Sequence, residues 1–138
     1  MRGLRRKWKK KANLTHRIMK PINLNQKFEK FQEHWTPKII GELNGHHIKL
    51  AKVKDELVWH SHADEDELFI VQKGTLYMDF RDKTVEVHEG EILVVPKGVE
   101  HLPRTNGEEV WLMLIEPIST KHTGEVEHEK TTNDQEWI

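Results

Sequence analysis

The 138-residue sequence contains no cysteine, so it can form neither a disulfide framework nor a thiol-based active site. It also lacks any apolar run close to the roughly 18 residues that a membrane-spanning helix needs. We therefore expect no membrane span and predict a cytoplasmic protein. The hydrophobic fraction of 36% and the charged fraction of 33% are typical of one globular domain with polar ends.

Acidic residues are absent from the first 20 positions, which hold nine of the 22 lysines and arginines. Residues 21–138 consequently carry 13 basic and 23 acidic side chains, a net charge of −10. This acidic body argues against nucleic-acid binding by the domain itself, although the basic block 2–11 could bind nucleic acid or a membrane surface. No apolar segment follows that block, so it is not a signal peptide. We expect residues 1–20 to be a disordered tail, and the charge break also fits a natural start at Met19.

Aromatic residues recur at helical spacing in the segment 21–37. Phe28, Phe31 and Trp35 fall on one stripe, which predicts a short amphipathic helix over Asn25–Trp35 that packs onto the body.

From Lys38 the pattern changes to short strands separated by turns. Asn44-Gly45 is a strong hairpin signal, because both residues tolerate positive φ. Many short strands at close spacing predict an all-β sandwich or barrel over 38–117. Residues 118–138 are too polar to form a core layer and are predicted to be a polar tail, although Trp137 and Ile138 could dock. The expected strands are 38–43, 46–54, 57–62, 68–72, 75–81, 84–88, 91–95 and 109–115.

Four side chains could bind one metal ion. His60 and His62 are two residues apart on a predicted strand, so their rings share a face. The polar residues 63–66 can reverse the chain, and Glu67 then opens the antiparallel partner strand opposite the two histidines. Its carboxylate enters an apolar cavity and needs a cation or hydrogen-bond donors there. His101 follows the turn 96–98 and supplies a fourth ligand from another hairpin. The alternative is a hydrogen-bonded polar cluster without a metal.

The spacing of these residues resembles the two motifs of the cupin family. His60-x-His62-x4-Glu67-x6-Gly74 is similar to the first motif, and Gly90-x5-Pro96-x-Gly98-x2-His101 is similar to the second. The resemblance covers 38–117, including a spacer at 75–89 as short as that of small bacterial cupins. The wider pattern is similar to uncharacterised single-domain cupins, sometimes described as mannose-6-phosphate isomerase-like. Lys54 and Thr105 stand where the family pattern has Gly and Asn, and both departures concern turns rather than metal ligands.

The resemblance implies a single-domain jelly-roll β-barrel with a short N-terminal helix and a site of three histidines and one carboxylate. Such a site suits one divalent transition metal, which would be Mn, Fe, Co, Ni or Zn. We expect a metal-dependent enzyme of isomerase or dioxygenase type acting on a small polar metabolite. The alternative is a non-catalytic module that binds the metal and a small ligand.

Two further residues are candidates for substrate binding, and one strand is a candidate dimer interface. Arg104 could hold an anionic substrate near His101, or it could be a surface partner of Glu108, and Tyr77 could line the cavity. The strand Lys38–Leu43 is predicted to be an exposed edge through which two copies form a homodimer. Other histidines are expected at the surface or in the tail, namely His46, His47, His88, His122 and His128, and His34 is expected to be structural or exposed.

Overall fold

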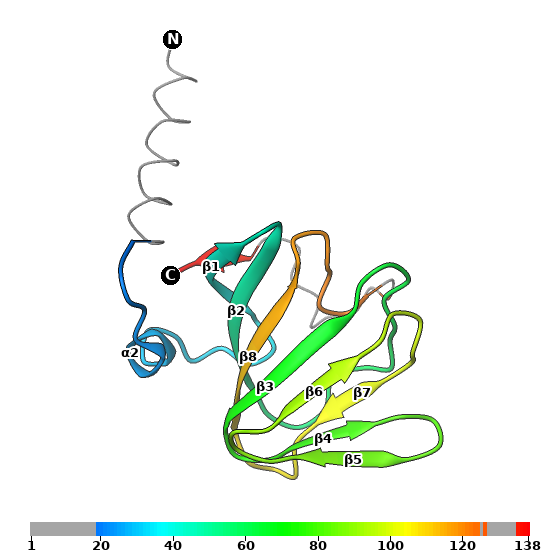
Figure 1. Cartoon of the computed structure of the whole chain (residues 1–138). Coiled ribbons are helices and arrows are strands. Elements are labelled where there is room, and N and C mark those ends of the chain that lie inside the picture. The colour runs from blue at the N-terminus through cyan, green and yellow to red at the C-terminus, as the bar shows by residue number, and fades with distance from the viewer. Residues whose placement is uncertain (1–18, 125, 127–134) are drawn as a thin grey trace.

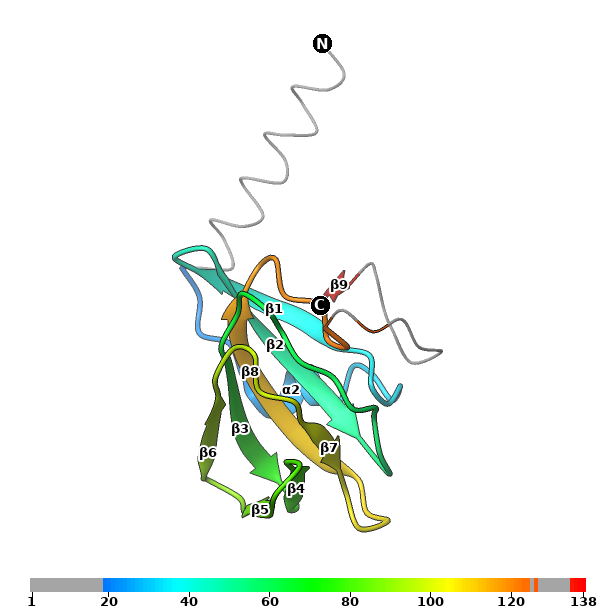
Figure 2. The ribbon, with the colours of Figure 1, turned by 90° about the vertical axis from the view of Figure 1, so that its right-hand side faces the viewer.

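The computed structural model describes residues 19–124, 126 and 135–138, which fold into two facing β-sheets (Figures 1 and 2). The basic block 2–11 and His128 lie outside the described residues. The larger sheet contains, in spatial order, β6 (Ile92–Val95), β3 (Glu67–Lys73), β8 (Val110–Pro117), β2 (His46–Val53), β1 (Lys38–Leu43) and β9 (Glu136–Trp137). The smaller sheet contains β5 (Thr84–Val87), β4 (Leu76–Asp79) and β7 (Leu102–Arg104).

The prediction of an all-β jelly-roll fold is confirmed, and the barrel is open. Asn44 and Gly45 have φ values of 47° and 75° and connect β1 to β2 in a tight hairpin, as the sequence indicates. No strand pairing among the described residues joins β6 to β5, so each is the outer edge of its sheet. Within the described residues, no helix is long and apolar enough to cross a bilayer.

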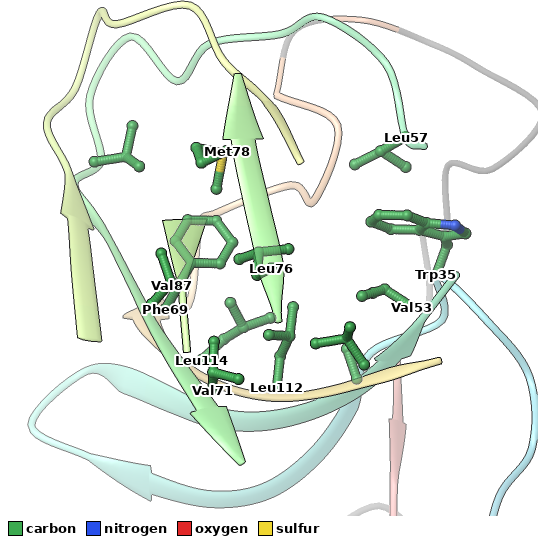
Figure 3. Close-up of a cluster of buried hydrophobic side chains, with 13 residues drawn as sticks. Trp35, Val53, Leu57, Phe69, Val71, Leu76, Met78, Val87, Leu112 and Leu114 are labelled. Carbon is green, nitrogen blue, oxygen red and sulfur yellow. The ribbon is translucent and has the colours of Figure 1, made fainter. Parts of the chain in front are cut away.

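The main core lies between the two sheets. Inward-facing residues from β2, β3 and β8 meet Leu76 and Met78 of the smaller sheet, and the last two are completely buried (Figure 3). Alternation with period two explains this arrangement, since every second residue of β3 and β8 is buried. A second apolar cluster, built around Phe28, Phe31 and Leu50, covers the outer face of the larger sheet near β2.

The predicted helix over Asn25–Trp35 is too long. Helix α2 spans only Leu24–Phe28, and Figure 1 shows it beside β2 on the side away from the smaller sheet. Phe28 and Phe31 join the outer cluster, whereas Trp35 belongs to the main core. Trp35 has a φ of 56° and donates its backbone N–H to the Lys52 carbonyl, so tertiary hydrogen bonding ends the helical path.

The predicted strand over Leu57–His62 is also not regular. The segment runs along β7 through isolated bridges, which pair Glu56 with Arg104 and His60 with His101. The departure at Thr105 is accommodated here, because its hydroxyl accepts the Asp55 backbone N–H at 2.9 Å. Strands β7 and β9 were not predicted, because they are three and two residues long and are too short to show the alternation of apolar and polar residues that identifies a strand.

The polar C-terminal segment is not simply a tail. Thr120, His122 and Thr123 are buried, so residues 118–124 pack against the body instead of extending into solvent. Strand β9 pairs in parallel with Lys38 and Ile39 of β1. The start of β1 is therefore not the exposed edge that the sequence suggests, because the chain's own C-terminal strand covers it.

Candidate metal centre

The four predicted ligands meet inside the barrel. One ligand atom from each of His60, His62, Glu67 and His101 lies within 4.8 Å of the others, and the four side chains are each 4% exposed or less. The geometry differs from the expected hairpin, because Glu67 is not on the hydrogen-bonded partner of the His60 segment. It faces the histidines from the larger sheet, where it pairs with Val95.

His60 and His101 are direct neighbours rather than ligands from separate hairpins. Their backbones exchange two hydrogen bonds of 2.9 and 3.1 Å, and their ring centroids lie 4.3 Å apart. The turn before His101 is fixed from the same side, since the Gly98 N–H donates to the His62 carbonyl at 2.7 Å. Asp66 accepts the Lys97 backbone N–H at 2.8 Å. These bonds hold the two motif segments together and bring their ligands to one point.

Backbone hydrogen bonds fix the orientation of two rings. Nδ1 of His60 lies 2.8 Å from the Val58 carbonyl oxygen, and Nδ1 of His101 lies 2.9 Å from that of Val99. A carbonyl oxygen only accepts, so each Nδ1 must carry the proton and each neutral ring keeps a lone pair on Nε2. This arrangement is common for metal-binding histidines, whose second nitrogen donates to a fixed acceptor.

The converging atoms do not satisfy one another. Nε2 of His62 and Nε2 of His101 lie 2.5 and 3.2 Å from Oε1 of Glu67, yet none of these three atoms has a hydrogen-bond partner among the described residues. Buried polar atoms without partners are rare and costly. A divalent cation would satisfy all three at once, so the donor set fits a metal ion.

Electrostatics within the cluster also favour a cation. Burial, followed by the electrostatic effect of the His101 ring nearby, lowers the pKa of His60 to about 4, so its ring is neutral at pH 7. The pKa of Glu67 is lowered despite its burial, because His101 and His62 stabilise the carboxylate. Burial opposes the charged form of His62, but the Glu67 carboxylate outweighs it and raises the pKa of that ring.

Two charged residues beside the cluster were not predicted as part of the site. Lys49 and Glu116 are each 1% exposed, and Nζ of Lys49 lies 2.8 Å from Oε1 of Glu116. Burial and the negative charge of Glu67 raise the pKa of Glu116, and the Lys49 ammonium opposes that shift. A signal was present in the sequence, because Lys49 falls on the same strand face as Ala51 and Val53, and Glu116 falls on the same face as Leu112 and Leu114.

The structure does not bring Arg104 and Tyr77 to the cluster. Arg104 donates two hydrogen bonds to Asp79, of 2.7 and 3.3 Å, and its guanidinium lies 5.0 Å from the Tyr77 ring centroid. Tyr77 alternates with Leu76 and Met78, which are buried in the core, so it points to the opposite side of the smaller sheet. His46 and His88 are exposed as expected.

Two hollows lie in the described part of the molecule, and none of the four predicted ligands lines either of them. The interior one has a volume of about 40 Å³ and an apolar lining that includes Phe69 and Leu114, with His122 at its wall. The other is an open groove of about 530 Å³ between the β4–β5 turn and the β6–β7 connection. Glu100 lines this groove, and the next residue along the chain is His101. The groove has the volume of a small-molecule site, whereas the interior hollow is far smaller.

An open jelly roll with three histidines and one glutamate converging inside it defines a protein of the cupin class. Comparison with known proteins agrees, because the family model described as "Cupin domain" matches residues 47–116, and the chain belongs to this family.

Solved structures support the assignment. A cupin-2 domain containing protein from Shewanella frigidimarina is 52% identical, with a TM-score of 0.68 over 70% of this chain and 93% of that one. A Neisseria meningitidis protein is 35% identical, with a TM-score of 0.65 over 71% and 99% of the two chains. The uncharacterised protein YdbB of Bacillus subtilis is 45% identical over 67 residues, which are 48% of this chain and 59% of that relative. The matched region therefore spans less than two thirds of this curated relative.

Proposed function

We propose that this cupin protein binds one divalent transition-metal ion, Mn, Fe, Co, Ni or Zn, through His60, His62, Glu67 and His101. The observation that carries the proposal is the buried convergence of four ligand atoms, three of which have no hydrogen-bond partner among the described residues. Nitrogen and carboxylate donors together suit these ions. When bound, such an ion supplies Lewis acidity toward a carbonyl or hydroxyl oxygen.

We further propose that the protein is an enzyme of isomerase or dioxygenase type that acts on a small polar metabolite. The chain's own contribution is orientation and exclusion of water. The backbone bonds to Val58 and Val99 hold two rings in one tautomer, and the burial of all four ligands keeps bulk solvent away. The open groove beside Glu100 has room for a metabolite.

The second candidate is a non-catalytic module that binds the metal and a small ligand, and one observation favours it. The interior hollow of about 40 Å³ is far smaller than the roughly 300–1,000 Å³ of a typical small-molecule site, so a sugar phosphate does not fit there.

Metal analysis of the purified protein tests the metal proposal. We expect about one transition-metal ion per chain, and none after the double change His60→Ala and His62→Ala, because two of four ligands are then lost. The matched control changes two exposed histidines, His46→Ala and His88→Ala, and should keep the metal. Equal metal content in the His60→Ala and His62→Ala double variant and the wild type would contradict the proposed site.

A substrate screen with metal-restored protein separates the two functional candidates. Turnover of a sugar phosphate or a keto acid would support the enzyme. A clean negative for both classes at full metal occupancy would favour the binding module. Mass spectrometry of small molecules that co-purify from native cells would narrow the substrate class in either case. A nucleic-acid role for residues 2–11 and a cytoplasmic location both stay predictions.

We also propose a homodimer, through a surface other than β1. Five apolar side chains form an uncharged strip on the outer face of β6, β3 and β8, where Ile92 and Val94 are 62% and 55% exposed. The body is strongly acidic, so two copies repel each other elsewhere and can approach best through an uncharged face. Analytical ultracentrifugation of the wild-type protein should give twice the mass of one chain. The Val94→Glu variant should give the mass of one chain, because it places a charge in the strip. The strip consists of Leu68, Ile70, Ile92, Val94 and Ile115.

A further inference from the structure

Lys49 and Glu116 form an ion pair inside the barrel that no ligand role explains. Both side chains are 1% exposed, and Nζ of Lys49 lies 2.8 Å from Oε1 of Glu116. Removing two charges from water costs about as much as their attraction returns, so a buried pair is a poor source of stability. Stability of the fold therefore does not account for an ion pair at this position beside the cluster.

The strand register places Glu116 next to the ligand Glu67. Leu68 of β3 is opposite Ile115 of β8, so the preceding and following residues, Glu67 and Glu116, are neighbours on adjacent antiparallel strands. Such neighbours have Cβ atoms about 5 Å apart. Both side chains point into the barrel, and burial, helped by the negative charge of Glu67, raises the pKa of Glu116. Glu116 therefore lies between the Lys49 ammonium and a predicted metal ligand.

We infer that Glu116, anchored by Lys49, positions the Glu67 carboxylate toward the three histidines and so sets the affinity of the metal site. The inference rests on the proposed metal binding. Oε1 of Glu116 is held by Lys49, while Oε2 has no hydrogen-bond partner among the described residues and lies on the side of the barrel that Glu67 shares. Partners that orient a ligating carboxylate typically change metal affinity about 10–100-fold when they are removed.

The same strand supplies a matched control. Lys52 is also buried, at 7% exposure, but it lies on the opposite face of β2, where Nζ donates to the Phe31 carbonyl at 2.8 Å. A Lys→Met change at position 52 therefore removes a buried lysine without touching the chain of contacts through Glu116.

Cobalt(II) titration of the metal-free protein tests the inference, because the visible absorption of cobalt reports both affinity and coordination geometry. Glu116→Leu should weaken Co²⁺ binding about 10–100-fold and change the spectrum. Glu116→Gln should keep most of the affinity, since the amide can accept from Lys49 and donate to Glu67. Lys49→Met should weaken binding, and Lys52→Met should not. Circular dichroism checks that each variant is folded.

These outcomes separate positioning from a simple charge effect. If charge alone mattered, Glu116→Gln and Glu116→Leu would lose affinity equally, and Lys49→Met would bind the cation more tightly. Either result overturns the inference, as does wild-type binding and spectrum in Glu116→Leu. If Glu116→Leu does not fold, the Glu116→Gln result and the comparison of Lys49→Met with Lys52→Met decide. A wild-type protein that binds no cobalt overturns the metal proposal as well, whereas failure of the variants alone overturns only this inference.

Discussion

The barrel interior has an apolar end and a charged end, and the same three strands build both. Along β8 the inward residues run from Val110 through Leu112 and Leu114 to Glu116. Along β3 they run from Val71 through Phe69 to Glu67, and β2 likewise changes from Val53 to Lys49. Burial is nearly complete at both ends, so the difference is one of chemistry. We therefore expect the apolar end to supply stability and the charged end, where the four predicted ligands lie, to carry the proposed function.

The largest expected effect is at the apolar end, with Phe69→Ala. Phe69 is 5% exposed, and removal of a buried phenyl ring typically destabilises a protein by about 3–5 kcal/mol. Urea unfolding with a chelator present measures the loss without any contribution from metal. Leu43→Ala is the control, because Leu43 is 54% exposed, lies outside the proposed dimer strip and should change stability by less than about 0.5 kcal/mol. Equal losses in the two variants would contradict the assignment of stability to the apolar end.

The next effect concerns pH at the charged end of the metal-free protein. The pKa of His60 falls from 6.5 to about 4 on folding, chiefly because the ring is buried. The unfolded chain therefore binds the proton more readily between these values, and stability should fall as pH drops from 6.5 to 4. A shift of this size corresponds to at most about 3 kcal/mol.

Thermal or urea unfolding across that pH range, compared between wild type and His60→Asn, isolates the contribution. His62 acts in the opposite direction, because its pKa is raised on folding and its contribution is lost as pH rises. The difference between the two proteins removes that background. Parallel stability curves for the two proteins would show that His60 does not titrate in this way.

The sequence predicted the ligand set because its evidence is local. A His-x-His pair followed by a turn and a carboxylate among apolar neighbours specifies three side chains without knowledge of the sheets, and the spacing of the second motif adds His101. The sequence could not predict that Glu67 faces the histidines from the other sheet, because strand pairing depends on contacts distant in the chain. The short helix α2 shows the same limit, since backbone bonds of Trp35 to β2 override its helical spacing. Residues 118–124 were missed because buried threonines and a histidine look like a solvated tail.

A smaller effect is expected at the segment 118–124, which covers the charged end. Gly124 has a φ of 58°, and a Cβ added there would lie 2.0 Å from the Ser61 carbonyl oxygen, between two predicted ligands. Gly124→Ala should therefore cost about 1–3 kcal/mol and weaken metal binding, because the segment must move away from Ser61. Gly107→Ala is the control, since Gly107 has a φ of 83° but open space around it. Equal metal affinity in the two variants would show that the contact with Ser61 does not support the site.

The smallest expected change in stability comes from replacing the buried ion pair as a whole. The double change Lys49→Met and Glu116→Leu removes both charges while keeping similar side-chain lengths, so neither partner is left buried and unpaired. Replacements of this kind are often neutral or stabilising, and we expect the metal-free protein to lose less than about 1 kcal/mol. Chemical unfolding of the metal-free variant measures this value, and cobalt titration of the same sample measures metal affinity. Retained stability with weakened metal binding would show that the charged end serves the metal site and not the stability of the fold. A loss of unfolding free energy comparable to that of Phe69→Ala would show that the charged end stabilises the fold as much as the apolar end does.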